Sequence, residues 1–147
     1  MNVIINSDSE VLADRLSNAL SVLADVQVTG VTKNLTEAEA AILKDNVKVL
    51  ITAFHKIEKT DFKKLKDIKL RNINLVVIVL NSDSSDENLK KWRKTGADYV
   101  FDQRMHFNKV VDILSGIIYK NLLTILKSSQ KIDHLIAKNK NDIQKLN

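Results

Sequence analysis

The 147-residue sequence contains no cysteine and only three glycines. Without cysteine the chain can form neither a disulfide framework nor a thiolate metal site. Three glycines leave no Gly-x-Gly-x-x-Gly motif and no Walker loop, so a glycine-rich phosphate-binding loop has no support. No apolar run approaches the roughly 18 residues of a membrane span, and we expect no signal peptide, because the sequence opens on a strand-like segment. We therefore expect no cofactor and, by default, a cytoplasmic location.

Hydrophobic residues make up 44% of the chain and charged residues 28%, a balance typical of a globular domain. The net charge is +5, and it is unevenly spread. Residues 1–119 carry 17 basic and 16 acidic side chains, whereas residues 120–147 carry six and two. Two shorter runs, 56–71 and 90–94, are also basic. We interpret both runs as solvated helix faces, which makes nucleic-acid contact the less favoured alternative.

Trp92 lies in the second basic run, next to Arg93. A tryptophan beside an arginine could stack on a nucleic-acid base. Its position on the apolar period of a helix favours a place in the hydrophobic core instead.

Strand-like and helix-like segments alternate along the chain. The β-branched or alternating apolar runs predict five strands, at residues 2–6, 26–31, 47–53, 75–81 and 97–101. The segments between them have helical periodicity, with Thr36 and Glu39 predicted as a capping box, Thr60 or Asp61 as a cap, and Gly96 as a stop. From about residue 108 the pattern is helical to residue 147.

Five strand–helix repeats joined by short links predict an α/β fold. Right-handed crossovers give a doubly wound parallel five-stranded sheet with helices on both faces, and domains of this size commonly take the flavodoxin-like strand order. In such a fold, ligands bind at the carboxyl ends of the strands. Any site chemistry is therefore expected at the ends of the predicted strands.

Three segments carry a resemblance to a known family. The segments VIINSDSEVLADRL, LVVIVLNSDSSDE and GADYVFDQ, in this order and spacing, resemble the receiver domain of bacterial response regulators, the CheY-like fold. The resemblance covers residues 2–121 and implies a role in two-component signal transduction. It also implies a phosphoryl-accepting aspartate at the end of the third strand, paired acids after the first strand, a Thr or Ser on the fourth and a lysine on the fifth.

This sequence departs from the family pattern at most of these positions. The resemblance puts the acceptor place at Thr52 or a neighbour, and no residue from 47 to 58 is an aspartate. One of the paired acids is Ser7, Gln103 replaces the lysine, and only a small polar group survives on the fourth strand. The predicted degenerate pocket comprises Ser7, Asp8, Thr52, Asn81, Ser82 and Gln103.

The remaining groups are poorly suited to phosphoryl transfer. Mg²⁺ is usually held by one or two carboxylates together with phosphate oxygens, so Asp8 alone would bind it weakly. The hydroxyl of Thr52 would need an activating base, and His55 is a lone loop histidine. We expect no enzymatic activity, no catalytic residue and no metal site, and interpret the chain as a pseudo-receiver.

The C-terminal segment carries a heptad repeat. Apolar or uncharged residues recur at spacings of four and three, which favours a coiled coil. The seam contains Ile118, Leu122, Ile125, Ser129, Ile132, Ile136, Asn139, Ile143 and Leu146. We therefore predict a receiver-like domain at 1–121 and a helical extension at 122–147 that forms a homodimer. The alternative is that the extension folds back on its own domain or frays.

The function predicted from these features is that of an atypical response-regulator receiver. It would act without phosphorylation as a signalling interaction and dimerisation module, as in the N-terminal part of a longer protein, with an unidentified protein partner or output domain. Two alternatives remain open at this stage. One is a phosphotransfer-competent receiver with a displaced acceptor, and the other is a basic nucleic-acid-binding regulator built on the helical tail.

Overall fold

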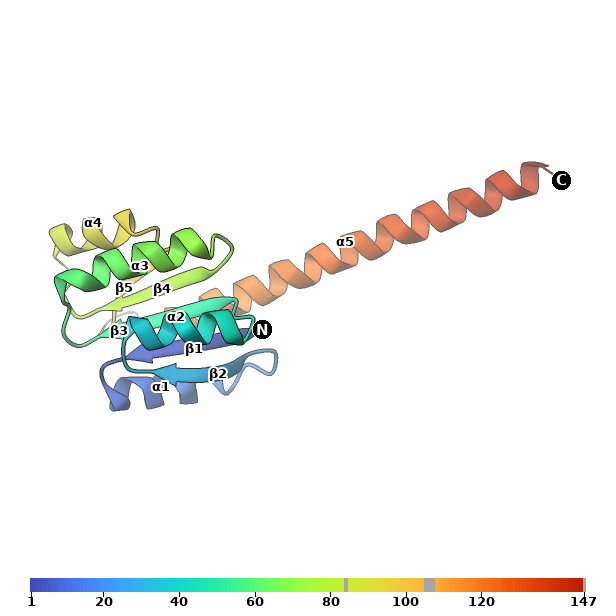
Figure 1. The fold of residues 1–147 in the computed structure, drawn as a ribbon. Helices are drawn as coiled ribbons and strands as arrows, with labels where there is room; N and C mark the ends of the chain where they lie inside the picture. Colours follow the sequence, from blue (N-terminus) through green and yellow to red (C-terminus); the bar gives the residue numbers. More distant parts are fainter. Residues whose placement is uncertain (84, 105–107, 147) are drawn as a thin grey trace. The chain divides into compact units, whose positions relative to one another are not determined.

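A computed structural model describes residues 1–83, 85–104 and 108–146 (Figure 1). Strands and helices alternate from one end of the described chain to the other. They are β1 (Asn2–Ser7), α1 (Glu10–Leu20), β2 (Gln27–Thr32), α2 (Leu35–Lys44), β3 (Val49–Phe54), α3 (Lys59–Arg71), β4 (Val76–Asn81), α4 (Asp86–Lys94), β5 (Tyr99–Asp102) and α5 (Lys109–Leu146). Residue 147, the predicted end of the last helix, lies outside the described residues.

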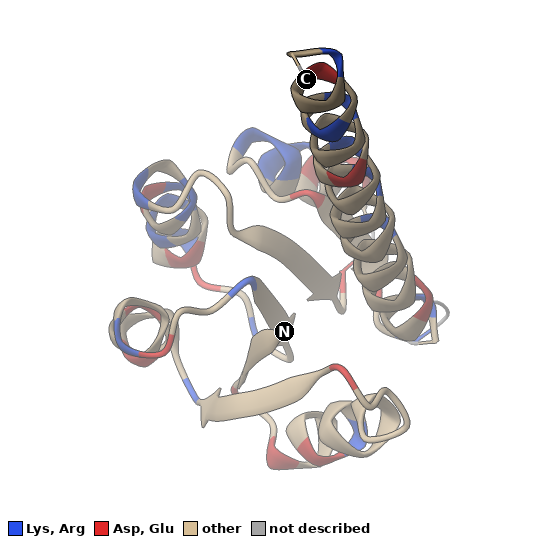
Figure 2. Ribbon diagram, turned by 90° about the vertical axis from the view of Figure 1, so that its right-hand side faces the viewer, with Lys and Arg blue, Asp and Glu red and all other residues tan. Residues whose placement is uncertain are grey.

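The five strands form one parallel sheet in the order β2-β1-β3-β4-β5. This order confirms the predicted flavodoxin-like fold. Helices α2, α3 and α4 cover one face of the sheet, and α1 covers the other (Figure 2). The carboxyl ends of all five strands therefore meet along one edge, where this fold places its binding sites.

The core is built from the two central strands and the helices that cover them. All six residues of β3 are buried, as a strand covered on both faces requires. Trp92 of α4 is fully buried, with its ring centroid 5.0 Å from that of Phe54 and 4.2 Å from that of Phe62 on α3. The interpretation of Trp92 as a core residue is confirmed, and it therefore cannot stack on a base.

The start of α2 differs from the prediction. The helix begins at Leu35, and the side chain of Asn34 caps it by accepting a hydrogen bond from the backbone N–H of Glu37 (2.9 Å). Thr36 and Glu39 therefore lie inside the helix, and the predicted capping box is wrong. Asparagine caps at least as well as threonine, and the earlier start lets Leu35 enter the core.

The start of α3 also differs, whereas the end of α4 agrees. Glu58 is the cap of α3, and Asp61 reaches back to accept its backbone N–H (2.8 Å), so neither Thr60 nor Asp61 is the capping residue. Helix α4 ends at Lys94, and Gly96, two residues later, has a φ of 87°. This left-handed conformation suits glycine, as the predicted stop requires.

The chain forms two compact units, Met1–Asp112 and Ile113–Asn147. The second unit consists of the greater part of α5, a single helix of 38 residues that contains the predicted boundary at 121/122. Every described residue from 119 onward is exposed, including the large apolar side chains of Ile125 and Ile143. No described helix is both long enough and apolar enough to cross a bilayer.

Candidate functional site

The edge formed by the ends of β1 and β3 contains a buried chain of polar side chains. Ser7 pairs with Ala53 in the sheet, and Asn6 pairs with Thr52. The Asn6 amide donates to the Thr52 hydroxyl (3.0 Å) and accepts a hydrogen bond from the Thr32 hydroxyl (2.7 Å). These bonds link three neighbouring strands and satisfy polar groups that would otherwise be costly to bury. The hydroxyl of Thr52 is thus held by Asn6, and the residue beside Ser7 has only a methyl group.

Asp8 fastens the loop that follows β3. One oxygen of its carboxylate accepts the backbone N–H of His55 (2.8 Å), and the other accepts the backbone N–H of Lys56 (3.0 Å). The neighbouring Ser7 hydroxyl accepts the backbone N–H of Ser9 (3.1 Å) at the start of α1. Both carboxylate oxygens therefore have loop partners, and the only acid left in the predicted pocket has a structural task.

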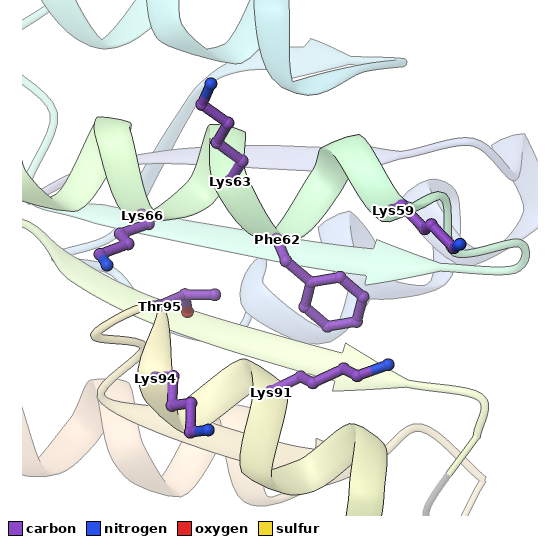
Figure 3. Close-up of a pocket in the computed structure, with 7 residues that line it drawn as sticks. All are labelled: Lys59, Phe62, Lys63, Lys66, Lys91, Lys94 and Thr95. Atoms are coloured by element: carbon purple, nitrogen blue, oxygen red, sulfur yellow. The ribbon is translucent and has the colours of Figure 1, made fainter.

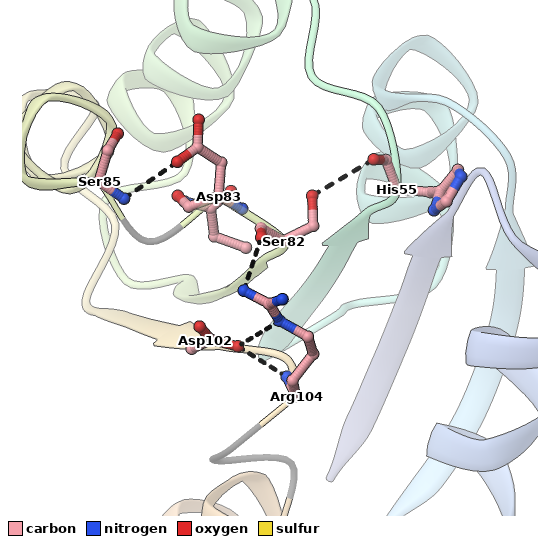
Figure 4. Close-up of polar contacts among 7 residues, drawn as sticks. His55, Ser82, Asp83, Ser85, Asp102 and Arg104 are labelled. Carbon is pink, nitrogen blue, oxygen red and sulfur yellow. Dashed lines mark hydrogen bonds and ion pairs between the residues drawn. The ribbon is translucent and has the colours of Figure 1, made fainter.

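The end of β4 is tied to the same loop, and the end of β5 is tied to the end of β4 (Figure 4). The Ser82 hydroxyl donates to the backbone carbonyl of His55 (3.3 Å). Arg104 bridges two strand ends, because its guanidinium lies 3.5 Å from the Asp102 carboxylate and 3.5 Å from the carbonyl of Ser82. The side chain of Asn81 donates to the carbonyl of Asp83. The loops at this edge are therefore joined to one another directly by protein groups.

Gln103 lies at the place where the resemblance implies a lysine. Its backbone N–H donates to the carbonyl of Asn81 (3.1 Å), which continues the pairing of β4 with β5. Its side-chain oxygen is buried and has no hydrogen-bond partner among the described residues. An amide in this place supplies no positive charge to stabilise a phosphoryl group.

A small cavity of about 150 Å³ opens beside this edge. Three carboxylates line it, those of Asp8, Glu58 and Asp61, together with the ammonium groups of Lys33 and Lys56. Burial raises the pKa of Asp61, and the nearby charges of Glu58 and Asp8 raise it further, while the hydrogen bond from the Glu58 backbone opposes the change. Among the described residues, no group of three or more His, Asp or Glu side chains is arranged to hold a metal ion.

The structure places the six predicted pocket residues along one edge of the sheet, and among the hydrogen bonds described above only that from the Gln103 backbone to the Asn81 carbonyl joins two of them. Asp8 contacts the loop after β3, Thr52 contacts Asn6, and Ser82 contacts that same loop. Sequence reasoning did not identify Asn6 or Arg104. A polar residue in the apolar run of β1 was the available signal for Asn6, whereas nothing in the sequence signalled the bridge made by Arg104.

Neither a known family model nor a curated protein matches the sequence. Solved structures match the fold. The RcsB response regulator of Salmonella typhimurium aligns with a TM-score of 0.67 and 22% identity over 79% of this chain and 60% of its own. The receiver domain of NarL from Mycobacterium tuberculosis aligns with a TM-score of 0.66 and 15% identity over 78% of this chain and 95% of its own.

A DNA-binding response regulator of the LuxR family from Staphylococcus aureus has a TM-score of 0.68 and 18% identity, over 79% of this chain and 97% of its own. These three structures are of response regulators or of their receiver domains. At such low identity the likeness establishes the fold. The chain corresponds to 60% of the length of the RcsB chain that it matches.

Proposed function

We propose that this protein is a receiver-type signalling module that acts without phosphorylation and pairs through its C-terminal helix. The observation that carries the first part is the state of Asp8. Its two carboxylate oxygens each accept a backbone N–H of the loop after β3, so the Asp8 side chain already binds that loop. A phosphoryl group would have to compete with these bonds.

The neighbouring positions support the same proposal. Phosphorylation of an aspartate needs a free carboxylate nucleophile and a divalent cation to neutralise the incoming charge. The residue beside Ser7 is Ala53, which has no nucleophile, and the hydroxyl of Thr52 is engaged by Asn6. Gln103 adds no cation to the site. The module would therefore signal by presenting a fixed surface to a protein partner.

The exposed face of α5 supports pairing with a second copy of the chain. The seam has Ile132 56% exposed and Ile143 60% exposed, and single helices in water rarely leave such side chains uncovered. Its strict heptad spacing suits a left-handed coiled coil, and Asn139 would meet its own copy in a parallel pair. The seam thus favours self-association over contact with an unrelated surface.

The experiment that tests phosphorylation independence is mass spectrometry after incubation with acetyl phosphate and Mg²⁺. We expect no phosphoryl adduct on the wild-type chain. As a matched control, Ser7→Asp, Ala53→Asp and Gln103→Lys together restore the carboxylates and the cation that the site lacks. Labelling of this variant alone would show that those groups are what is missing. A Mg²⁺-dependent adduct on any aspartate of the wild-type chain would favour the displaced-acceptor alternative.

A further inference from the structure

A second cavity lies away from the strand ends, between α3 and α4. It has a volume of about 480 Å³, within the usual range for small-molecule sites. Seven residues line it, which are Lys59, Phe62, Lys63, Lys66, Lys91, Lys94 and Thr95 (Figure 3). We call this cavity the lysine cleft. It brings together the two basic runs that the sequence suggested were separate solvated faces.

The charge of the lysine cleft is of one sign. Five of its seven lining residues are lysines and none is acidic. Of these five lysines, only Lys91 forms an ion pair with a described residue, Glu87, which lies at 3.4 Å and one helical turn away. Helices α3 and α4 together hold ten basic and four acidic residues, whereas the rest of the chain holds 13 and 14. Packing these ammonium groups together is unfavourable unless an anion offsets their repulsion.

The floor of the lysine cleft is aromatic. Phe62 projects from α3 toward α4, and its ring rests against Trp92, which is fully buried and fixes it in place. The ammonium group of Lys91 lies 5.7 Å from the centre of the Phe62 ring. The lysine side chains also contribute apolar stems below their charged ends. The cleft therefore combines a flat apolar surface with a rim of positive charge.

The dimensions of the lysine cleft suit a compact anion. Its lining positions on α3 run from Lys59 to Lys66, a distance of about 10 Å along the helix. On α4, Asp86 and Glu87 precede the lining residues, and Glu87 is already paired with Lys91. The acidic start of α4 would repel a polyanion that continued past this end of the helix. A long nucleic-acid strand is therefore disfavoured relative to a small molecule.

We propose that the lysine cleft binds a nucleoside di- or triphosphate. The phosphates would contact the ammonium groups, chiefly those of Lys63, Lys66 and Lys94, and the base would lie on the ring of Phe62. The hydroxyl of Thr95 already donates to the carbonyl of Trp92, and the lysines are flexible donors with no acceptor, so the lining offers no fixed donor–acceptor pair to distinguish one base from another. Binding is therefore tolerant of the base. It needs no glycine-rich loop and does not depend on the state of Asp8.

Isothermal titration calorimetry of the full chain at low ionic strength, with ATP, GTP and inorganic triphosphate, tests the proposal. We expect ATP and GTP to bind with affinities within about threefold of each other, because stacking on an aromatic ring is largely independent of the base. Inorganic triphosphate should bind more weakly, because it lacks the ring. Backbone amide shifts in an ¹⁵N NMR titration should be confined to 59–66 and 91–95.

Substitutions on the two helices separate the roles of charge and ring. Lys63→Gln with Lys94→Gln should weaken ATP binding by about tenfold or more, since each removes a charged hydrogen-bond donor to phosphate. Lys90→Gln with Arg93→Gln removes the same charge from exposed positions of α4 outside the cleft and should change the affinity by less than about twofold. Phe62→Leu should weaken ATP binding while leaving that of triphosphate unchanged.

Three results would overturn the proposal. The first is the absence of ATP binding to a wild-type chain whose fold is verified by its NMR spectrum. The second is an equal loss of affinity in both charge variants, which would indicate only a general effect of net charge. The third is binding of a single-stranded oligonucleotide in the absence of nucleotide binding, which would assign the cleft to nucleic acid. None of these results would affect the phosphorylation test, which addresses a different part of the molecule.

Discussion

Two opposing effects act on the pKa of the Asp61 side chain, which are its burial and its hydrogen bond with the Glu58 backbone. Its carboxylate accepts the backbone N–H of Glu58 and so completes the first turn of α3. Burial nevertheless raises its pKa above the ordinary value of 3.8, and the charges of Glu58 and Asp8 act in the same direction. The folded protein therefore holds a proton on Asp61 more tightly than the unfolded chain does.

The tighter binding of this proton in the folded state should make the stability depend on pH. Since the folded-state pKa is the higher one, the contribution of Asp61 to the free energy of unfolding should fall as pH rises from the unfolded value near 3.8 through the folded value. Asp61→Asn retains an oxygen to accept the Glu58 N–H and removes the titration. We expect the stability of this variant relative to wild type to increase over that interval by less than about 1 kcal/mol. Urea unfolding at several pH values measures the difference.

A second variant controls for the loss of one negative charge. Asp14 lies exposed on α1, and Asp14→Asn removes the same charge without touching α3. If the pH profiles of the two variants coincide, the effect is not specific to Asp61. A relative stability that falls with rising pH would contradict the assignment outright.

At the level of residues, the sequence predicted positions better than contacts. The substitutions at Ser7 and Gln103 could be identified because spacing along the strands places them at one edge. The partner of Thr52 could not, because the hydrogen bond from Asn6 depends on the register between two strands that are 46 residues apart. The loop contacts of Asp8 could not be predicted either, because they too join segments that are far apart in the sequence. A helix start such as that of α2 was missed because Asn34 and Thr36 are both acceptable caps.

At the level of elements, α5 presents an amphipathic helix of about 57 Å whose described residues beyond 118 are all exposed. Periodicity alone predicted this helix, since its heptad pattern continues for four repeats. The structure confirms the helix, whereas the coiled coil stays a prediction. A helix that pairs in water usually has apolar residues in its seam and charged residues outside it.

Pairing through α5 predicts a specific effect of two seam substitutions. Ile132→Glu with Ile136→Glu places four carboxylates in the centre of a parallel pair, so we expect a folded monomer. Gln130→Glu with Ala137→Glu adds the same charge at positions outside the seam and should leave a dimer. Sedimentation equilibrium measures both, and the wild-type dimer should tighten with ionic strength because the lysines outside its seam repel one another.

Two outcomes would contradict the pairing. A dimer that survives the two seam substitutions would place the interface elsewhere. Loss of folding in the same variant would mean that the seam packs within its own chain. Circular dichroism distinguishes the second outcome from dissociation, because a dissociated chain keeps its sheet signal.

At the level of the whole molecule, the buried hydrophobic residues all lie between Val3 and Leu114. Removing residues 122–147 deletes only exposed side chains among those described. We therefore expect the fragment 1–121 to unfold cooperatively, with a free energy of unfolding within about 0.5 kcal/mol of that of the monomeric full chain. Urea unfolding at low protein concentration tests this. A fragment that fails to fold would show that the extension contributes to the core.

The overall architecture could be predicted because five strand–helix repeats with short links admit few topologies. The lysine cleft could not. Its two walls are separated by a complete strand, and only the packing of α3 against α4 brings Lys63 and Lys94 to one cavity. Composition had located the positive charge chiefly in the C-terminal segment, because a count along the chain does not reveal which helices become neighbours.

The single tryptophan of the chain has an optical consequence. Trp92 is fully buried between two phenylalanine rings, so its fluorescence should be emitted at shorter wavelength than that of a solvated indole. Any event that shifts Phe62 will change the intensity or anisotropy of that emission. The described part of α5 has no tryptophan, so it contributes no emission when the indole is excited selectively. The unlabelled protein thus carries an intrinsic probe that follows α3 and α4 alone.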